Sequence, residues 1–299
     1  MARPLPLALG FETMSEARGD LARLAVPGLI WGTSFYFIAE GLAAFPAIMI
    51  TPMRIGLGFA TLSFVPAARV RLPRSAWPRL FLLGLIWMAV PLTMFPFAGE
   101  RVASSVSGML NGAIPLFVAT VATLVYKRRP SRSQLYGLAV GFGGVILIAL
   151  PTLDDGSSSA IGLGLIFIAL ACYGFALDLA APLQREYGSL PVLWNTQLVA
   201  FVLTAPFGLA KVGDVDFAWK PFLMIVGLGV FGTALAYVAM AANAGRFGST
   251  RASVTTYLIP VVSLILGAVI LDEVVEIVSV IGCAITLWGA YLAGRARAN

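Results

Sequence analysis

Ten apolar stretches fill this chain of 299 residues, and only short connections separate them. A helix of about 20 apolar residues spans a hydrocarbon core roughly 30 Å thick. Charged residues make up 11% of the chain, whereas a soluble domain carries about 25%. The pattern predicts an all-α membrane protein with ten transmembrane helices, at 21–43, 46–67, 78–98, 103–126, 132–151, 159–181, 190–210, 220–243, 249–271 and 275–294.

Lysine and arginine are concentrated in alternate connections between these stretches. If the N-terminus is cytoplasmic, sixteen of them fall in cytoplasmic segments, and three, Arg101, Lys211 and Lys220, fall outside. Cytoplasmic loops of membrane proteins carry an excess of these residues. The distribution therefore predicts that both termini are cytoplasmic.

The second half of the chain repeats the first. A shift of 145 residues superimposes 101–148 on 246–293 and matches Ile114-Pro115 to Ile259-Pro260. Each half holds five stretches, so an odd number of crossings inverts the second half, and Lys127-Arg128 corresponds to Asp272-Glu273. Inverted repeats of this kind are typical of alternating-access transporters. We expect five-helix repeats at 21–151 and 159–294, flanked by cytoplasmic tails at 1–20 and 295–299.

Several kinds of chemistry are absent from the residues. The chain contains no histidine, and both cysteines, Cys172 and Cys283, lie within apolar stretches. We find no glycine-rich phosphate loop and no paired buried carboxylates, so neither a catalytic site nor a metal or cofactor is expected. The net charge of +6 reflects loop asymmetry rather than a nucleic-acid surface. An intramembrane enzyme or an assembly factor is the distant alternative.

Prolines within the stretches identify candidate hinges. Pro115 frees the carbonyl of Asn111, Pro260 frees that of Thr256, and Pro91 frees that of Trp87, because proline has no backbone N–H. In lipid a freed carbonyl needs another partner, such as cavity water or a bound molecule. Asn111 and Thr256 are equivalent positions in the two halves, so we expect them to meet near the middle of the membrane. The alternative is a plain kink that packs against glycine.

Aromatic and amide side chains within the stretches are the other candidates for a cavity wall. Soft methionines and flat aromatic rings suit apolar groups of varied shape. The competing interpretation for each residue is helix packing or a hydrogen bond between helices. The candidates are Trp31, Tyr36, Trp87, Met88, Tyr173, Asn195, Tyr237 and Tyr257.

Two ionisable residues inside the stretches, Arg54 and Asp178, are candidates for a functional role. Arg54 is deeper than an arginine usually snorkels, and it either takes a substrate carboxylate or pairs with Glu40. Asp178 is close to the cytoplasmic end of its stretch, which favours a solvated carboxylate over a proton relay. With Glu40 and Glu273, it is a candidate for energy coupling. A phosphate carrier would need several buried cations, so the cargo is expected to lack phosphate.

Particular motifs resemble a known family. The stretch Gly232-Thr-Ala-Leu-Ala-Tyr237, followed by Ser249, Ile259-Pro260-Val261, Asp272-Glu273 and Gly282, resembles the EamA-type module of the drug/metabolite transporter superfamily. Both halves resemble it, over about 22–148 and 162–294. The resemblance implies a ten-helix carrier of small metabolites. One departure from the family pattern is Arg128. It stands where an acidic residue is usual, at the turn between the fourth and fifth stretches of the first half, so any role of that acidic residue remains only at Glu273.

The overall pattern is similar to bacterial exporters of aromatic and other neutral amino acids. The resemblance implies an inner-membrane protein that exports such amino acids by alternating access around a site near Trp31, Trp87, Asn111, Tyr173 and Thr256. The alternative is an exporter of drugs, nucleosides or other small metabolites on the same fold. A monomer is expected, because ten helices complete a cavity without a partner. The sequence leaves downhill transport and proton exchange as alternatives.

Overall fold

A computed structural model describes residues 7–125, 127, 129–153, 156–247 and 253–295 of the chain. Within these ranges the protein is helical and contains no strand, which confirms the all-α prediction. Seven helices are long and apolar enough to cross a membrane, or eight if one bent pair is counted as a single span. Arg128 and Ser249, discussed above, lie outside the described residues, as do residues 1–6 and 296–299 of the expected tails.

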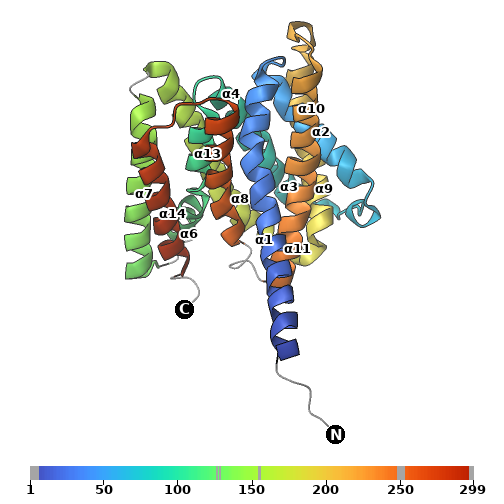
Figure 1. The fold of residues 1–299 in the computed structure, drawn as a ribbon. Helices are drawn as coiled ribbons and strands as arrows, with labels where there is room; N and C mark the ends of the chain where they lie inside the picture. Colours follow the sequence, from blue (N-terminus) through green and yellow to red (C-terminus); the bar gives the residue numbers. More distant parts are fainter. Residues whose placement is uncertain (1–6, 126, 128, 154–155, 248–252, 296–299) are drawn as a thin grey trace.

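The first half begins with helix α1 and ends with α7. Its helices are α1 (Leu7–Leu42), α2 (Ala47–Ser63), α3 (Trp77–Leu83), α4 (Val90–Gly99), α5 (Ser104–Asn111), α6 (Ile114–Leu124) and α7 (Arg132–Leu153). The second half holds α8 (Ser157–Tyr187), α9 (Ser189–Leu209), α10 (Trp219–Gly227), α11 (Ala236–Phe247), α13 (Leu258–Ile270) and α14 (Ile277–Arg295). Because α1 begins at Leu7, residues 7–20, which were expected to be a separate N-terminal tail, form the first part of this helix. The start of α1 and the end of α14 lie at the same face of the bundle (Figure 1).

Two of the expected spans are interrupted. The stretch at 103–126 divides into α5 and α6, which are bent by 44° relative to each other. Pro115 lies in the first turn of α6, where its missing N–H is not needed by the helix. In the stretch at 249–271, a 3-10 turn at Ser253–Tyr257 precedes α13. Helix α5 ends at Asn111, and the 3-10 turn ends at Tyr257, the residue after Thr256. Both ends therefore lie at or next to the pair of equivalent positions named above.

Wide helical turns join α3 to α4 and α10 to α11. The chain is π-helical at Gly84–Ala89 and again at Leu228–Leu235. Pro91 lies two residues after the first segment, and its missing N–H releases the α-helical bond to Trp87, which helps to explain why the ladder widens there. Widened turns of this kind often occur at functional sites.

Element boundaries recur at a constant spacing along the chain. Helices α7 and α14 begin at Arg132 and Ile277, 145 residues apart, and the interruptions after Asn111 and Tyr257 are 146 residues apart. Contacts between elements also come in matching pairs. Helix α2 packs on α9, α7 on α14, α1 on α13, and α6 on α8.

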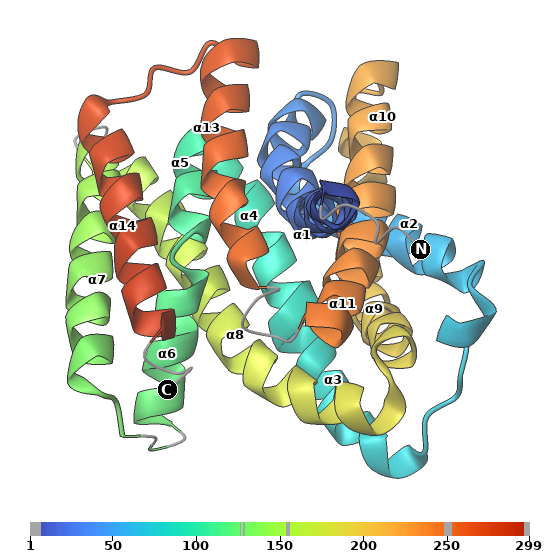
Figure 2. The same ribbon diagram turned by 60° about the horizontal axis from the view of Figure 1, so that its bottom comes forward.

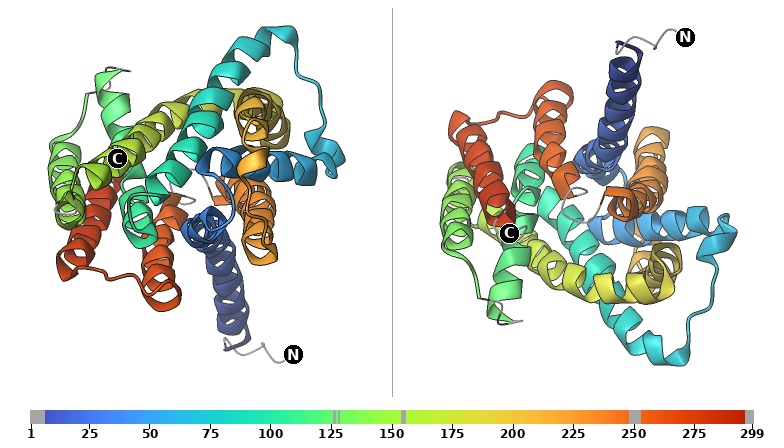
Figure 3. Two further views of the ribbon diagram at one scale, coloured as in Figure 1. Left: turned by 90° about the horizontal axis from the view of Figure 1, so that it is seen from above. Right: turned by 90° about the horizontal axis from the view of Figure 1, so that it is seen from below.

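The interface between α7 and α14 is formed by small residues. A Cβ atom at Gly144 would lie 2.5 Å from the carbonyl oxygen of Gly282, so the two backbones are in direct contact there. Glycine permits this approach because it has no side chain. Figure 3 shows the pair, green α7 beside red α14, at one edge of the bundle, and Figure 2 shows α4 and α8 nearer its centre.

Candidate substrate-binding site

A cavity of about 440 Å³ lies among the helices of both halves. Its wall includes side chains of α1, α2, α4, α6, α8, α11 and α13. We call it the central cavity. Nine of the residues singled out from the sequence line it, namely Trp31, Arg54, Trp87, Asn111, Pro115, Tyr173, Tyr237, Thr256 and Tyr257.

Three aromatic rings form one corner of the central cavity. Tyr237 makes edge-to-face contacts with Trp31 and with Trp87, each at 5.3 Å between ring centroids. Trp31 donates its indole N–H to the carbonyl of Gly232 at 3.1 Å, inside the second π-helical segment. This hydrogen bond satisfies the polar atom of a ring that otherwise presents an apolar surface. The corner is therefore a fixed aromatic wall.

Arg54 places a positive charge on the same wall. Its side chain is only 3% exposed, and its Nε donates to the hydroxyl of Thr233 at 3.0 Å. The Thr233 carbonyl in turn accepts from Gln197 Nε2 at 2.7 Å, so contacts from α9 and the π-helical segment position the guanidinium. Arg54 makes no ion pair with a carboxylate in the described part of the chain.

The alternative partner for Arg54 is engaged elsewhere. Glu40 accepts a hydrogen bond from Lys220 Nζ at 2.8 Å. The planar guanidinium carries five N–H donors, and one of them is used by Thr233. A buried arginine without a carboxylate is costly unless another anion reaches it. The central cavity is therefore suited to a molecule that carries a negative group.

Asn111 contributes a hydrogen-bond acceptor to the cavity. It is the last residue of α5, at the bend before α6, and it is 7% exposed. Among the described residues its Oδ1 atom has no hydrogen-bond donor. Buried polar atoms are rarely left unsatisfied, so this oxygen is available to a donor on a bound molecule.

Pro260, equivalent to Pro115, is buried on α13, where its Cγ would lie 2.7 Å from a Cβ at Gly112. It therefore also packs against glycine, as the alternative of a plain kink predicts.

Other candidates from the sequence lie outside the lining of the central cavity. Met88 is fully buried in protein, and Asn195 donates to the carbonyls of Pro191 and Val70. Tyr36 lies near Glu40 and Lys220. Pro91 is buried in α4, and Asp178 is half-buried on α8. Conversely, the lining includes residues that were not singled out as site residues, among them Ser34, Phe35, Ile38, Phe95, Gln184 and Met240.

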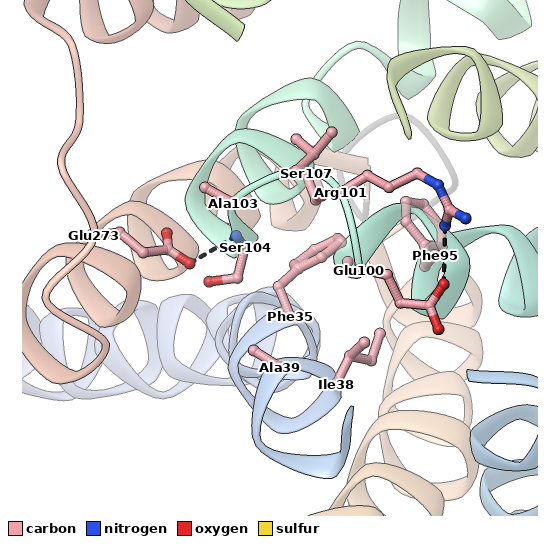
Figure 4. A pocket seen from close by; sticks show the side chains of 12 residues that line it. Phe35, Ile38, Ala39, Phe95, Glu100, Arg101, Ala103, Ser104, Ser107 and Glu273 are labelled. Atoms are coloured by element: carbon pink, nitrogen blue, oxygen red, sulfur yellow. Dashed lines mark hydrogen bonds and ion pairs between the residues drawn. The ribbon is translucent and has the colours of Figure 1, made fainter. Parts of the chain in front are cut away.

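A second cavity, of about 280 Å³, contains Glu273 and is shown in Figure 4. Both oxygens of Glu273 accept backbone N–H groups at the start of α5, from Ser104 at 2.7 Å and Ser105 at 2.9 Å. This carboxylate thus caps the N-terminus of α5 from a loop 169 residues further along the chain. Arg101 lines the same cavity and bonds Glu100 at 2.9 Å.

The two cavities share part of their walls. Phe35, Ile38 and Phe95 line both of them. The rings of Phe35 and Phe95 meet edge to face at 5.4 Å, and all three side chains are buried. These residues form an apolar barrier between the second cavity and the central one.

A bundle of apolar helices, seven of them long enough to cross a membrane, around a cavity with aromatic walls is the architecture of a multi-pass membrane protein. The chain belongs to the EamA-like transporter family, whose model matches residues 21–150 and 160–295. This match confirms the resemblance seen in the motifs. The family, within the drug/metabolite transporter superfamily, points to a membrane transporter rather than an enzyme.

Two relatives are similar to this chain over nearly their whole length. An "Uncharacterized transporter" of Archaeoglobus fulgidus is 23% identical over 92% of this chain and 98% of its own. A "Probable amino-acid metabolite efflux pump" of Salmonella typhimurium is 24% identical over 93% and 95%. One solved crystal structure matches with a TM-score of 0.62 at 18% identity, covering 92% of this chain and 96% of the other. That structural similarity concerns the fold alone.

Proposed function

We propose that this protein exports neutral and aromatic amino acids across a bacterial inner membrane by alternating access around the central cavity. The observation that carries the proposal is Arg54, a buried cation at the wall of an aromatic cavity, with no carboxylate partner among the described residues. The α-carboxylate of an amino acid supplies the missing anion. Arginine recognises carboxylates through paired N–H donors.

The rest of an amino acid also finds complementary groups in the cavity. The Oδ1 atom of Asn111 accepts from the ammonium group, and the faces of Trp31 and Trp87 add cation–π attraction. Aromatic and aliphatic side chains pack against the apolar wall. The efflux pump of Salmonella typhimurium is named for amino-acid metabolites, which supports the same class of cargo.

The proposed architecture is ten membrane helices in two inverted five-helix repeats with cytoplasmic termini. It counts seven long helices, the bent pair α5 and α6, and the two shorter apolar helices Ala47–Ser63 and Thr255–Ile270. At 1.5 Å per residue, the 17 residues of Ala47–Ser63 rise about 25 Å. The constant spacing of boundaries and the matching helix pairs support the repeats. The cavity is complete within one chain, so we propose a monomer that needs no cofactor.

Export from preloaded liposomes tests the cargo. Purified protein is reconstituted, and the efflux of labelled phenylalanine, methionine and threonine is compared with that from protein-free vesicles. We expect phenylalanine and methionine to leave at least several-fold faster through the protein. If no amino acid leaves faster than from empty vesicles, the proposed cargo is wrong.

The second candidate function is export of drugs, nucleosides or other small metabolites on the same fold. The family and the fold accommodate it equally, and the apolar majority of the cavity wall favours it. A nucleoside and a lipophilic cation are therefore included in the same efflux panel. Faster efflux of either one, without amino-acid efflux, would favour this candidate.

Repeating the panel with a pH gradient tests proton coupling through Glu40, Asp178 or Glu273.

A further inference from the structure

The second cavity contains both signs of charge, unlike the central one. Arg101, Glu100 and Glu273 line it together with the hydroxyl-bearing Ser104 and Ser107. Figure 4 shows Glu273 and Ser104 at one end and Arg101 with Glu100 at the other, with Phe35 between them. None of the described residues that line the central cavity is acidic. Only the second cavity offers a formal negative charge to an ammonium group.

We propose that the second cavity is a second cargo site, which binds the ammonium and carboxylate groups of a zwitterion between the central cavity and the Glu273 face of the bundle. The proposal rests on the amino-acid export proposed above. It adds a site to which neither the motifs nor the family similarity assigns a ligand.

Ser107 carries the first argument for a ligand. Its side chain is 3% exposed and lines the cavity, and its hydroxyl has no hydrogen-bond partner among the described residues. A buried hydroxyl without a partner costs free energy unless something binds it. Because the hydroxyl can both donate and accept, it suits either charged group of a zwitterion.

The charged residues retain bonding capacity for a ligand. Each carboxylate oxygen of Glu273 accepts one backbone N–H, and each has a second lone pair available. Within the part of the chain that the structure describes, Arg101 bonds Glu100 and the Phe97 carbonyl, both through one terminal nitrogen. Its other N–H groups remain for a carboxylate. The ammonium of the cargo therefore binds at Glu273 and Ser107, and the carboxylate binds at Arg101.

The shared wall is the place where cargo would pass between the two sites. Phe35, Ile38 and Phe95 separate the cavities and contact both. Phe95 also stacks on Tyr173 of the central cavity at 6.2 Å. Movement of these rings would pass a molecule from the wall that holds Arg54 to the cavity that holds Glu273.

The neighbouring serines provide a matched pair of variants. Ser105 also has a buried hydroxyl that finds no partner among the described residues, but it does not line the second cavity. Ser107→Ala and Ser105→Ala each remove one unpaired hydroxyl, so neither is expected to weaken the fold. Uptake of labelled phenylalanine is measured in membrane vesicles of both orientations, which present opposite faces of the protein to the medium.

We expect Ser107→Ala to raise the half-saturating phenylalanine concentration about tenfold when the Glu273 face meets the medium. We expect less than a twofold change from the opposite face, and none from either face for Ser105→Ala. Competitors provide a second readout. Phenylethylamine and phenylpropionate, which each lack one charge, should compete several-fold less well than phenylalanine from the Glu273 face.

The outcomes separate the two proposals. Equal effects from both faces, equal effects of the two serine variants, or equal competition by the singly charged analogues would overturn the second site while leaving amino-acid export intact. If wild-type protein transports no amino acid from either face, the proposed function fails, and the second site fails with it.

Discussion

Arg54 and Asn111 are the two residues on which the proposed cargo most depends. Among the described residues, Arg54 is a donor without an anion and Asn111 provides an acceptor without a donor, and both line the central cavity. Each buried polar group has a cost that a matching ligand group removes. The pair therefore favours a molecule with a carboxylate and an amine over one with a single polar group.

Asn111→Ala tests the amine side of this pair. We expect phenylalanine affinity to fall at least tenfold, because a hydrogen bond to a charged group is worth roughly 1.5 to 3 kcal/mol. Phenylpropionate has no amine, so its affinity should change less than twofold. Both dissociation constants can be measured by quenching of tryptophan fluorescence in detergent. An equal loss of affinity for both ligands would show that the substitution disturbs the structure of α5 and that Asn111 does not recognise the amine.

At the scale of elements, contact between helices depends on the absence of side chains. Gly144 of α7 faces the backbone of α14 at Gly282, whereas its neighbour Gly143 faces open space. This difference explains why glycines in a membrane helix are not equivalent.

Gly144→Ala is expected to lower the stability of the protein. The added Cβ would force α7 and α14 apart, and overpacking of this kind costs about 1 to 3 kcal/mol. Gly143→Ala is the matched control, because alanine favours a helix by about 1 kcal/mol over glycine where nothing obstructs it. The thermal unfolding midpoint in detergent should fall for the first variant and stay or rise for the second. A fall of equal size in both would contradict the close contact.

Much of the fold follows from the sequence. Apolar stretches predict where most of the helices lie, although α1 begins at Leu7 rather than near residue 21, and Pro115 predicts where α5 gives way to α6. The partners of particular side chains do not follow, because they are far apart in the chain. Arg54 meets Thr233 across 179 residues, and Trp31 meets Gly232 across 201. The N-terminal capping of α5 by Glu273 depends on the same tertiary packing.

The candidate site could be predicted only in part, because it too is assembled from residues that lie far apart in the chain. Residue type and depth are enough to suggest Trp31, Trp87, Tyr173 and Arg54. They do not distinguish Met88 or Asn195, which have the same character but are turned into the protein packing. Phe35 and Phe95 gain their importance only from lying between two cavities, which no local pattern reveals.

At the scale of the whole molecule, the apolar barrier keeps the two cavities separate. Phe95→Ala is expected to join them and to open a leak for small zwitterions. Flux of labelled glycine through proteoliposomes should rise several-fold over wild type. Phe222→Ala, which removes a half-buried ring on α10 that lines neither cavity, is the control. Unchanged glycine flux in the first variant would show that other residues form the barrier.

The proposed recognition of a carboxylate by Arg54 unites the site, the fold and the function. Arg54→Gln removes the charge while keeping a side chain that can still bond Thr233. The dissociation constants for phenylalanine and phenylethylamine are measured on wild type and variant. We expect phenylalanine binding to weaken at least tenfold, as loss of a charged hydrogen bond worth about 1.5 to 3 kcal/mol implies. Phenylethylamine lacks the carboxylate and should bind within twofold of wild type. Unchanged phenylalanine binding, or an equal loss for both ligands, would contradict a carboxylate site at Arg54.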